Sequence, residues 1–227
     1  MGNGMLYGVS VGPGDPELLT LKALRIIRQS PVIAVPRTRG GNTLALDIAA
    51  QAVELEGKKI LYLDQLMGTD QEAMQQRYAE NAARVMDELA DGADVALLNL
   101  GDVTIYSTCA YIMELVAQKG FRCEMLPGVT SFCACAALLG QSLAEWDQPL
   151  HIFPGSYQDL DAALDTPGGK VLMKSARALP VIREKIIQRG LQDRTSVVSD
   201  CGLPTQKIYS ITDEDIHSYF TMIIIRP

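Results

Sequence analysis

Short runs of β-branched and aliphatic residues alternate with longer helical patterns along this chain of 227 residues. This alternation predicts an α/β protein, because helices between strands connect parallel neighbours and cover the faces of their sheet. In the first half we expect strands at 6–11, 32–35, 59–63, 94–100 and 122–126, and helices near 17–29, 43–55, 71–91 and 108–119. This half therefore predicts a mostly parallel sheet whose carboxyl ends are open to ligands.

The pattern changes after the Pro-Gly turn at 127–128. A helix rich in small residues at 131–139 comes first, and further strands are expected at 149–153, 170–174, 195–200, 207–211 and 219–226, with helices near 157–164 and 177–189. The short connection before the last strand favours an antiparallel or mixed sheet. We therefore predict two α/β domains, at 1–124 and 125–227, with a ligand cleft between them.

Charge and hydropathy narrow the range of partners. The chain carries 20 Lys and Arg against 27 Asp and Glu, a net charge of −7. Nucleic-acid affinity depends mostly on cationic contacts with phosphates, so this balance argues against a nucleic-acid partner. No apolar run approaches the roughly 20 residues that span a bilayer. No positive charge precedes an apolar stretch at the start of the sequence. We therefore predict a cytoplasmic protein without a membrane partner.

Cysteine and histidine usage bears on metal binding. The five cysteines form no CxxC pair and favour buried free thiols over a disulfide framework. They are Cys109, Cys123, Cys133, Cys135 and Cys201. The two histidines, at 151 and 217, are too scattered for a metal site built by the protein. We predict no protein-bound metal.

The first candidate loop joins the first strand to the first helix. Gly12, Pro13 and Gly14 form a tight turn, and Asp15 is placed to cap the helix that follows. The glycine spacing makes neither a dinucleotide fingerprint nor a P-loop, and two acidic residues at the helix start would repel a pyrophosphate. The loop is therefore a structural turn or a turn shaped to a ligand other than a dinucleotide.

Three further segments carry polar groups at strand ends or helix starts. Gly101 and Asp102 follow the most apolar strand, where open α/β sheets bind ligands. Thr130 and Ser131 begin the small-residue helix and supply hydroxyl groups. Met173 ends a later strand and precedes two cations, Lys174 and Arg177. Helix capping, tight packing and core filling are the structural alternatives for these segments.

Together the four segments resemble those of the tetrapyrrole (corrin/porphyrin) methylase family, and the resemblance covers essentially the whole chain. The matching motifs are Gly12-Pro13-Gly14-Asp15-Pro16-Glu17-Leu18-Leu19-Thr20, Leu100-Gly101-Asp102 with Tyr106-Ser107-Thr108, and Pro127-Gly128-Val129-Thr130-Ser131-Phe132. Within the family, these segments look most like the C20-methyltransferases of cobalamin synthesis, which act on precorrin-2 or cobalt-factor II.

The resemblance implies a methyltransferase that uses S-adenosylmethionine and works as a homodimer. It places the cofactor against Gly101, Asp102, Ile105, Thr130, Ser131, Met173, Cys201 and Gly202. The loop of Gly12, Pro13 and Gly14 would face the tetrapyrrole. The methyl donor is already activated, so no enzyme nucleophile is required. A proton must leave the methylated carbon, and Asp15, Asp102 or Tyr106 could assist.

The implied substrate carries many carboxylates, so local cations must receive it. Arg37 and Arg39 follow the second strand, and Lys174 and Arg177 follow Met173. Arginine binds carboxylates with two parallel hydrogen bonds. The alternative for each cation is a solvated surface charge.

Three other functions remain open on the sequence alone. A different tetrapyrrole methylase, of the siroheme or C11 type, would share the loops and methylate another position. A diphthamide-synthesis methyltransferase would act on a protein, and a non-catalytic small-molecule sensor would bind without reaction.

Overall fold

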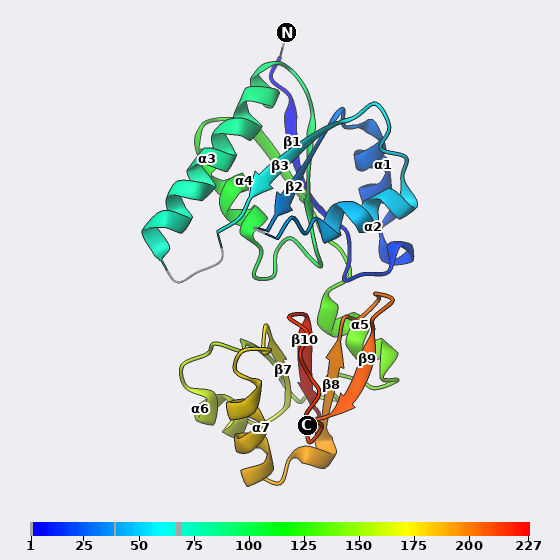
Figure 1. Cartoon of the computed structure of the whole chain (residues 1–227), viewed down its shortest axis with the longest axis vertical. Helices are drawn as coiled ribbons and strands as arrows, with labels where there is room; N and C mark the ends of the chain where they lie inside the picture. The colour runs from blue at the N-terminus through cyan, green and yellow to red at the C-terminus, as the bar shows by residue number, and fades with distance from the viewer. Residues whose placement is uncertain (1, 39, 67–69) are drawn as a thin grey trace. The chain divides into compact units, whose positions relative to one another are not determined.

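The computed structural model describes residues 2–38, 40–66 and 70–227, which form two compact units. The first unit extends to Thr130, and the second is Ser131–Pro227. The division falls after Thr130 and not after residue 124, because the strand at 122–126 pairs with the first strand of the chain. Each unit contains one five-stranded sheet (Figure 1). No described helix is long and apolar enough to cross a membrane.

The first unit contains a parallel sheet in the order β3-β2-β4-β1-β5. Its strands are β1 (Met5–Ser10), β2 (Val32–Arg37), β3 (Lys59–Asp64), β4 (Val95–Asn99) and β5 (Arg122–Leu126). All five expected strands are present. β4 is buried along its whole length, as its unbroken apolar sequence predicts for the centre of a parallel sheet.

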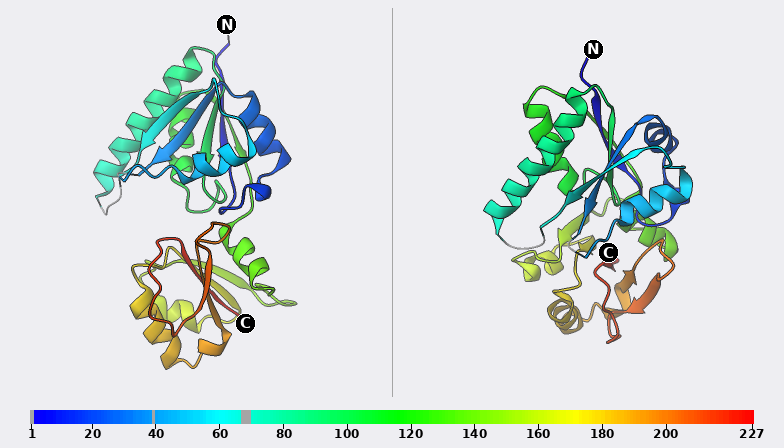
Figure 2. Two further views of the ribbon diagram at one scale, coloured as in Figure 1. Left: turned by 45° about the vertical axis from the view of Figure 1, so that its right-hand side comes forward. Right: turned by 45° about the horizontal axis from the view of Figure 1, so that its top comes forward.

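Two pairs of helices cover the faces of this sheet (Figure 2). On one face α3 (Gln71–Ala90) and α4 (Thr108–Gln118) pack against a core that includes Val85, Leu97 and Ile112. On the other face α1 (Leu21–Gln29) and α2 (Leu44–Ala52) pack against a core that includes Ile27 and Leu98. The two faces of one sheet therefore each have a core, as a doubly covered α/β unit requires.

The start of α1 differs from the sequence prediction, which places a helix from residue 17. The chain instead forms a 3-10 turn over Pro16–Leu18, extends at Leu19, and begins α1 at Leu21. The Thr20 side chain accepts a hydrogen bond of 3.1 Å from the Ala23 amide. A threonine N-cap satisfies the first amides of a helix and so fixes its start, which explains the later boundary.

The second unit contains a mixed sheet in the order β6-β7-β10-β8-β9. Its strands are β6 (Leu150–Pro154), β7 (Gly169–Met173), β8 (Thr195–Ser199), β9 (Lys207–Ser210) and β10 (Thr221–Ile225). β6 and β7 are parallel, whereas β10 lies antiparallel between β7 and β8. The mixed sheet confirms the prediction for this half of the chain.

Three helices complete the second unit. α5 (Ser131–Leu138) packs against β10. α6 (Leu160–Asp165) and α7 (Leu179–Gln188) share a core cluster with the sheet, which includes Leu172, Ile182 and Ile223. Ion pairs from Arg189, just after α7, to Asp161 and Asp165 join the two helices at their exposed surface.

Candidate active site

The carboxyl ends of the strands in the first unit bring three of the four candidate segments, together with Arg37, to one edge. Because β1, β2, β4 and β5 are parallel, the residues that follow them lie along the same edge of the sheet. The sequence-predicted residues at this edge are Gly12, Pro13, Gly14, Asp15, Arg37, Gly101, Asp102, Ile105, Tyr106 and Thr130. The parallel topology therefore brings loops that are far apart in the sequence to the same edge of the sheet.

A backbone bridge joins the loops after β1 and β4. Gly101 N–H donates to the Gly12 carbonyl at 2.7 Å, and Gly12 N–H donates to the Gly101 carbonyl at 3.3 Å. Both residues have a left-handed backbone, with φ of +77° at Gly12 and +73° at Gly101. Residues with a side chain disfavour this conformation, so the geometry of the bridge explains why both positions are glycine. The two hydrogen bonds also keep the backbones of the two loops close together.

Ser10 connects three strand ends, and the sequence analysis did not single it out. Its hydroxyl donates to the Leu126 carbonyl at 2.7 Å and accepts from the Val103 amide at 2.9 Å. A Cβ added to Gly128 would lie 2.5 Å from the Ser10 Cβ. Only glycine therefore fits at 128, and the buried hydroxyl links the ends of β1, β4 and β5. The position of Ser10, a small polar residue at the end of a buried strand, is the one sequence signal that could have indicated this role.

Asp102 is 7% exposed, and its carboxylate holds two loops together. One oxygen, Oδ1, accepts from the Thr104 amide at 2.8 Å and from the Thr104 hydroxyl. The other, Oδ2, accepts from the Gly128 amide at 2.7 Å. Burial opposes ionisation, but these hydrogen bonds outweigh it and hold the pKa of Asp102 below its usual value. The carboxylate is thus an ionised acceptor that fixes the Gly101 and Gly128 loops.

Residues 105–107 complete the loop after β4. Ser107 caps α4, where its hydroxyl accepts from the Cys109 amide at 3.1 Å and donates to Asn99 Oδ1 at 2.6 Å. Tyr106 has a φ of +48° and is 45% exposed. A left-handed conformation at a bulky residue is uncommon and costs backbone strain. Ile105 is half-buried beside it.

Thr130 carries a buried hydroxyl whose hydrogen bonding is incomplete. Within the described residues, Thr130 Oγ1 has no hydrogen-bond partner. A buried polar atom without a partner costs about 1–3 kcal/mol, so such atoms mark positions where a ligand or water completes the bonding. The Thr130 hydroxyl is therefore available to a ligand with a polar edge.

Asp15 caps a turn. Its Oδ1 accepts from the Glu17 amide at 2.8 Å, at the start of the 3-10 turn. Gly12, Pro13 and Gly14 before it are buried, and Asp15 is half-buried. The capping role predicted for Asp15 is confirmed, with a 3-10 turn in place of the α-helix.

Arg37 is the last residue of β2 and does not lie in the loop beyond it. Its Nε donates to Asp64 Oδ1 at 2.8 Å, and its guanidinium carbon lies 4.8 Å from the centre of the Tyr62 ring. The hydrogen bond from Arg37 lowers the pKa of Asp64. The charge of Arg37 is therefore already partly compensated by a neighbouring strand. Arg39 lies outside the described residues.

The second unit gathers its own set of predicted residues. Because β10 is antiparallel to both β7 and β8, the carboxyl ends of β7 and β8 lie at the same edge. Met173 is the last residue of β7 and Lys174 follows it, whereas Cys201 and Gly202 follow β8. Lys174 and Gly202 have left-handed φ values of +55° and +81°. Arg177 is exposed further along the chain, and Ser131 begins α5.

Cys201 interacts with a second thiol. Cys135 in α5 is buried, whereas Cys133 on the same helix is exposed. The interaction with Cys201, together with burial, raises the pKa of Cys135, and the same interaction lowers the pKa of Cys201. Cys201 is therefore the more acidic of the two thiols. No group of three or more His, Cys, Asp or Glu side chains suited to a metal ion occurs within the ranges that the structure describes.

The comparisons with known proteins agree with this fold. Residues 5–216 match the model of the Tetrapyrrole (Corrin/Porphyrin) Methylases. The chain is 33% identical to a probable cobalt-precorrin-2 C(20)-methyltransferase of Methanocaldococcus jannaschii, over 97% of this chain and 95% of the relative. It is 29% identical to a precorrin-2 C(20)-methyltransferase of Sinorhizobium sp, over 99% and 96%. A cobalt precorrin-4 methyltransferase structure superposes with a TM-score of 0.75 at 23% identity, covering 98% of this chain and 94% of that one.

Proposed function

The chain belongs to the tetrapyrrole (corrin/porphyrin) methylase family, and from that membership we propose that it transfers a methyl group from S-adenosylmethionine to C20 of precorrin-2 or cobalt-factor II in cobalamin synthesis. The observation that carries this proposal is the near full-length similarity to two C20-methyltransferases. The linked glycine loops at the strand ends support it, because open α/β sheets bind ligands at such edges.

Residues from each unit would hold the cofactor. In the first unit these are Gly101, Asp102, Ile105 and Thr130, and in the second Ser131, Met173, Cys201 and Gly202. The Thr130 hydroxyl supports this assignment, since it is buried and lacks a partner in the described part of the chain. The bridged backbone at Gly12 and Gly101 and the Asp102 hydrogen bonds would keep this surface in one conformation.

The cofactor supplies an electrophilic sulfonium methyl group, so the protein has to position the reactants. Correct alignment of two reactants can contribute several kcal/mol, up to about 7–11 in favourable cases. The loop of Gly12, Pro13 and Gly14 would receive the tetrapyrrole. Because its backbone is tied to the Gly101 loop by two hydrogen bonds, substrate and cofactor surfaces would keep a fixed spacing.

Asp102 fits a positioning role better than that of a base. Both of its carboxylate oxygens accept hydrogen bonds, and its pKa is lowered, so it has little tendency to take up a proton. If a base is needed, Asp15 and Tyr106 are the remaining candidates. The exposure and left-handed backbone of Tyr106 support a contact with substrate.

The substrate carboxylates would be received by Arg37, Arg39, Lys174 and Arg177. Arg37 is held in place by Asp64 and Tyr62, which favours an oriented guanidinium over a mobile one. From the resemblance we propose a homodimer, and from the composition and net charge a cytoplasmic protein without a nucleic-acid or membrane partner.

A paired assay tests the proposal. The protein is incubated with S-adenosylmethionine and either precorrin-2 or cobalt-factor II under strict anaerobiosis, and the product is analysed by mass and by the position of the new methyl group. Transfer of one methyl group to C20 supports the proposal. Methylation of uroporphyrinogen III in place of both substrates would assign a siroheme-type activity. Binding of S-adenosylhomocysteine without methylation of any tetrapyrrole would favour a sensor.

A further inference from the structure

β5 forms one edge of the sheet in the first unit. Among the described residues it pairs only with β1, so the other side of Arg122–Leu126 presents backbone N–H and C=O groups without a strand partner. An uncovered edge strand is a template for pairing with another chain, and proteins usually shorten, charge or cover such edges. The free side of β5 is therefore a candidate contact with another protein chain.

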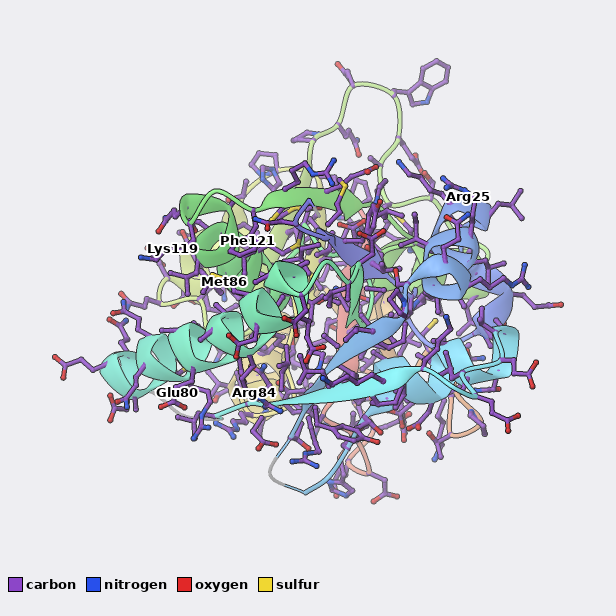
Figure 3. The ribbon with its side chains drawn as sticks, turned by 90° about the horizontal axis from the view of Figure 1, so that it is seen from above. Arg25, Glu80, Arg84, Met86, Lys119 and Phe121 are labelled. Carbon is purple, nitrogen blue, oxygen red and sulfur yellow. The ribbon has the colours of Figure 1, made fainter. Side chains whose placement is uncertain are left out.

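The residues along this edge have a self-complementary order. Residues 121–125 read Phe-Arg-Cys-Glu-Met, which is apolar, basic, thiol, acidic and apolar. Successive side chains of a strand point to opposite faces, so the two charged residues share one face and the other three share the opposite face. The contacts agree, because Glu124 pairs with Lys22 of α1 whereas Phe121 and Cys123 pack against the core beneath α4. Figure 3 shows Phe121 between α4 and β5.

A groove runs beside the strand on the α4 face. It has a volume of about 450 Å³ and is lined mainly by apolar groups of α4 and β5, including Tyr111, Cys123 and Met125. Tyr111 is 56% exposed and Met125 42%. Apolar and aromatic side chains gathered beside an open strand edge are typical of a surface that contacts another protein.

We propose that β5 pairs with β5 of a second copy of the chain, antiparallel and centred on Cys123, so that two five-stranded sheets join across the edge. The second copy is taken from the homodimer of the proposed function. In this register Arg122 lies opposite Glu124 of the partner subunit, and the reverse pair forms as well. Phe121 lies opposite Met125 of the partner subunit at both ends. The two α4 helices then lie on the same face and cover the grooves.

The charges select this register over its neighbours. A pair centred on Arg122 sets two arginines opposite each other, and a pair centred on Glu124 sets two glutamates opposite each other. Like charges directly opposite destabilise an antiparallel pair, whereas opposite charges stabilise it. Centring on Cys123 is thus the arrangement with two favourable charge pairs and two apolar pairs.

A charge-swap series measured by sedimentation tests the pairing. The wild-type protein should be a dimer, and Arg122→Glu should weaken dimerisation by about tenfold or more because both charge pairs become repulsive. The double variant Arg122→Glu/Glu124→Arg should restore it. Lys119→Glu makes the same charge change at an exposed site outside the strand and should leave the dimer intact. Circular dichroism checks that each variant is folded.

Crosslinking tests the register independently. Directly opposite residues of an antiparallel pair have Cα atoms about 4.5–5.5 Å apart, within reach of a disulfide. Mild oxidation, or a short bismaleimide, should therefore link subunits through Cys123. Cys123→Ser should abolish the linked dimer, and Cys133→Ser, which removes an exposed thiol, should not.

The inference is overturned by a monomer at all concentrations, by a dimer indifferent to Arg122→Glu, by a double variant that stays monomeric, or by a crosslink through another cysteine. These results are separate from the fate of the proposed function. A monomer that methylates the tetrapyrrole refutes the pairing alone. A dimer linked through Cys123 that methylates nothing refutes the function alone.

Discussion

Gly128→Ala should disrupt the connected loops of the first unit. The new Cβ would lie 2.5 Å from the Ser10 Cβ, and Ser10 lies in β1, where its hydroxyl is hydrogen-bonded to Leu126 and Val103. Overpacking a rigid site costs about 1–3 kcal/mol. The shift it requires also weakens the hydrogen bond from the Gly128 amide to the Asp102 carboxylate, 2.7 Å in the structure. A bond to a charged group contributes about 1.5–3 kcal/mol, so we expect a loss of roughly 3–5 kcal/mol.

Thermal unfolding followed by circular dichroism measures this loss. For a protein of this size, a loss of roughly 3–5 kcal/mol should lower the midpoint by about 6–20 °C. Gly40→Ala is the matched control, because nothing lies within 4 Å of a Cβ added there, and its midpoint should stay near that of the wild type. Equal midpoints for Gly128→Ala and the wild type would show that the contact with Ser10 relaxes freely, and the account of the three linked strand ends would be wrong.

Three other substitutions test single groups. Asp102→Asn should lower the free energy of unfolding by about 2 kcal/mol at pH 7. Because the folded pKa of Asp102 is lowered, its contribution is complete above the usual carboxyl pKa of about 3.9 and lost as the pH falls below it. The difference between the urea midpoints of wild type and variant should therefore be constant well above the usual carboxyl pKa and shrink as the pH falls through the lowered pKa of the folded state, and a difference that stays constant at acid pH would contradict this. Thr130→Val should keep or raise the free energy of unfolding, because it removes a buried hydroxyl without a partner, and it should weaken S-adenosylhomocysteine binding by about tenfold in calorimetry. Unchanged affinity would remove Thr130 from the site. Arg37→Ala should weaken tetrapyrrole binding and leave cofactor binding intact, and equal tetrapyrrole titrations would refute its role.

The fold could be predicted because each strand and helix is marked by residues close together in the sequence. The apolar runs that became β1 to β5 are bounded by glycine, proline and polar residues, and the Arg122–Leu126 strand has the predicted bounds. The start of α1 could not be predicted as well, since Asp15 and Thr20 are both good N-caps and only the structure shows that each caps its own short segment.

The candidate site was predictable only in part, because its decisive contacts join distant residues. The Ser10 hydroxyl reaches Val103 and Leu126, more than ninety positions along the chain. The partner of Arg37 is Asp64, on the neighbouring strand. Sequence patterns identify residues at strand ends, but they do not show which carboxylate is already satisfied. For this reason the sequence did not show that both carboxylate oxygens of Asp102 already accept hydrogen bonds.

The hydroxyl of Ser10 has a consequence for the thermodynamics of recognition. The buried Ser10 hydroxyl restrains the turns after three strands. The backbone of these turns therefore loses its conformational entropy when the chain folds and not when a ligand binds. Because binding then requires little further ordering of the loops, the contacts that a ligand makes with them contribute almost fully to its affinity.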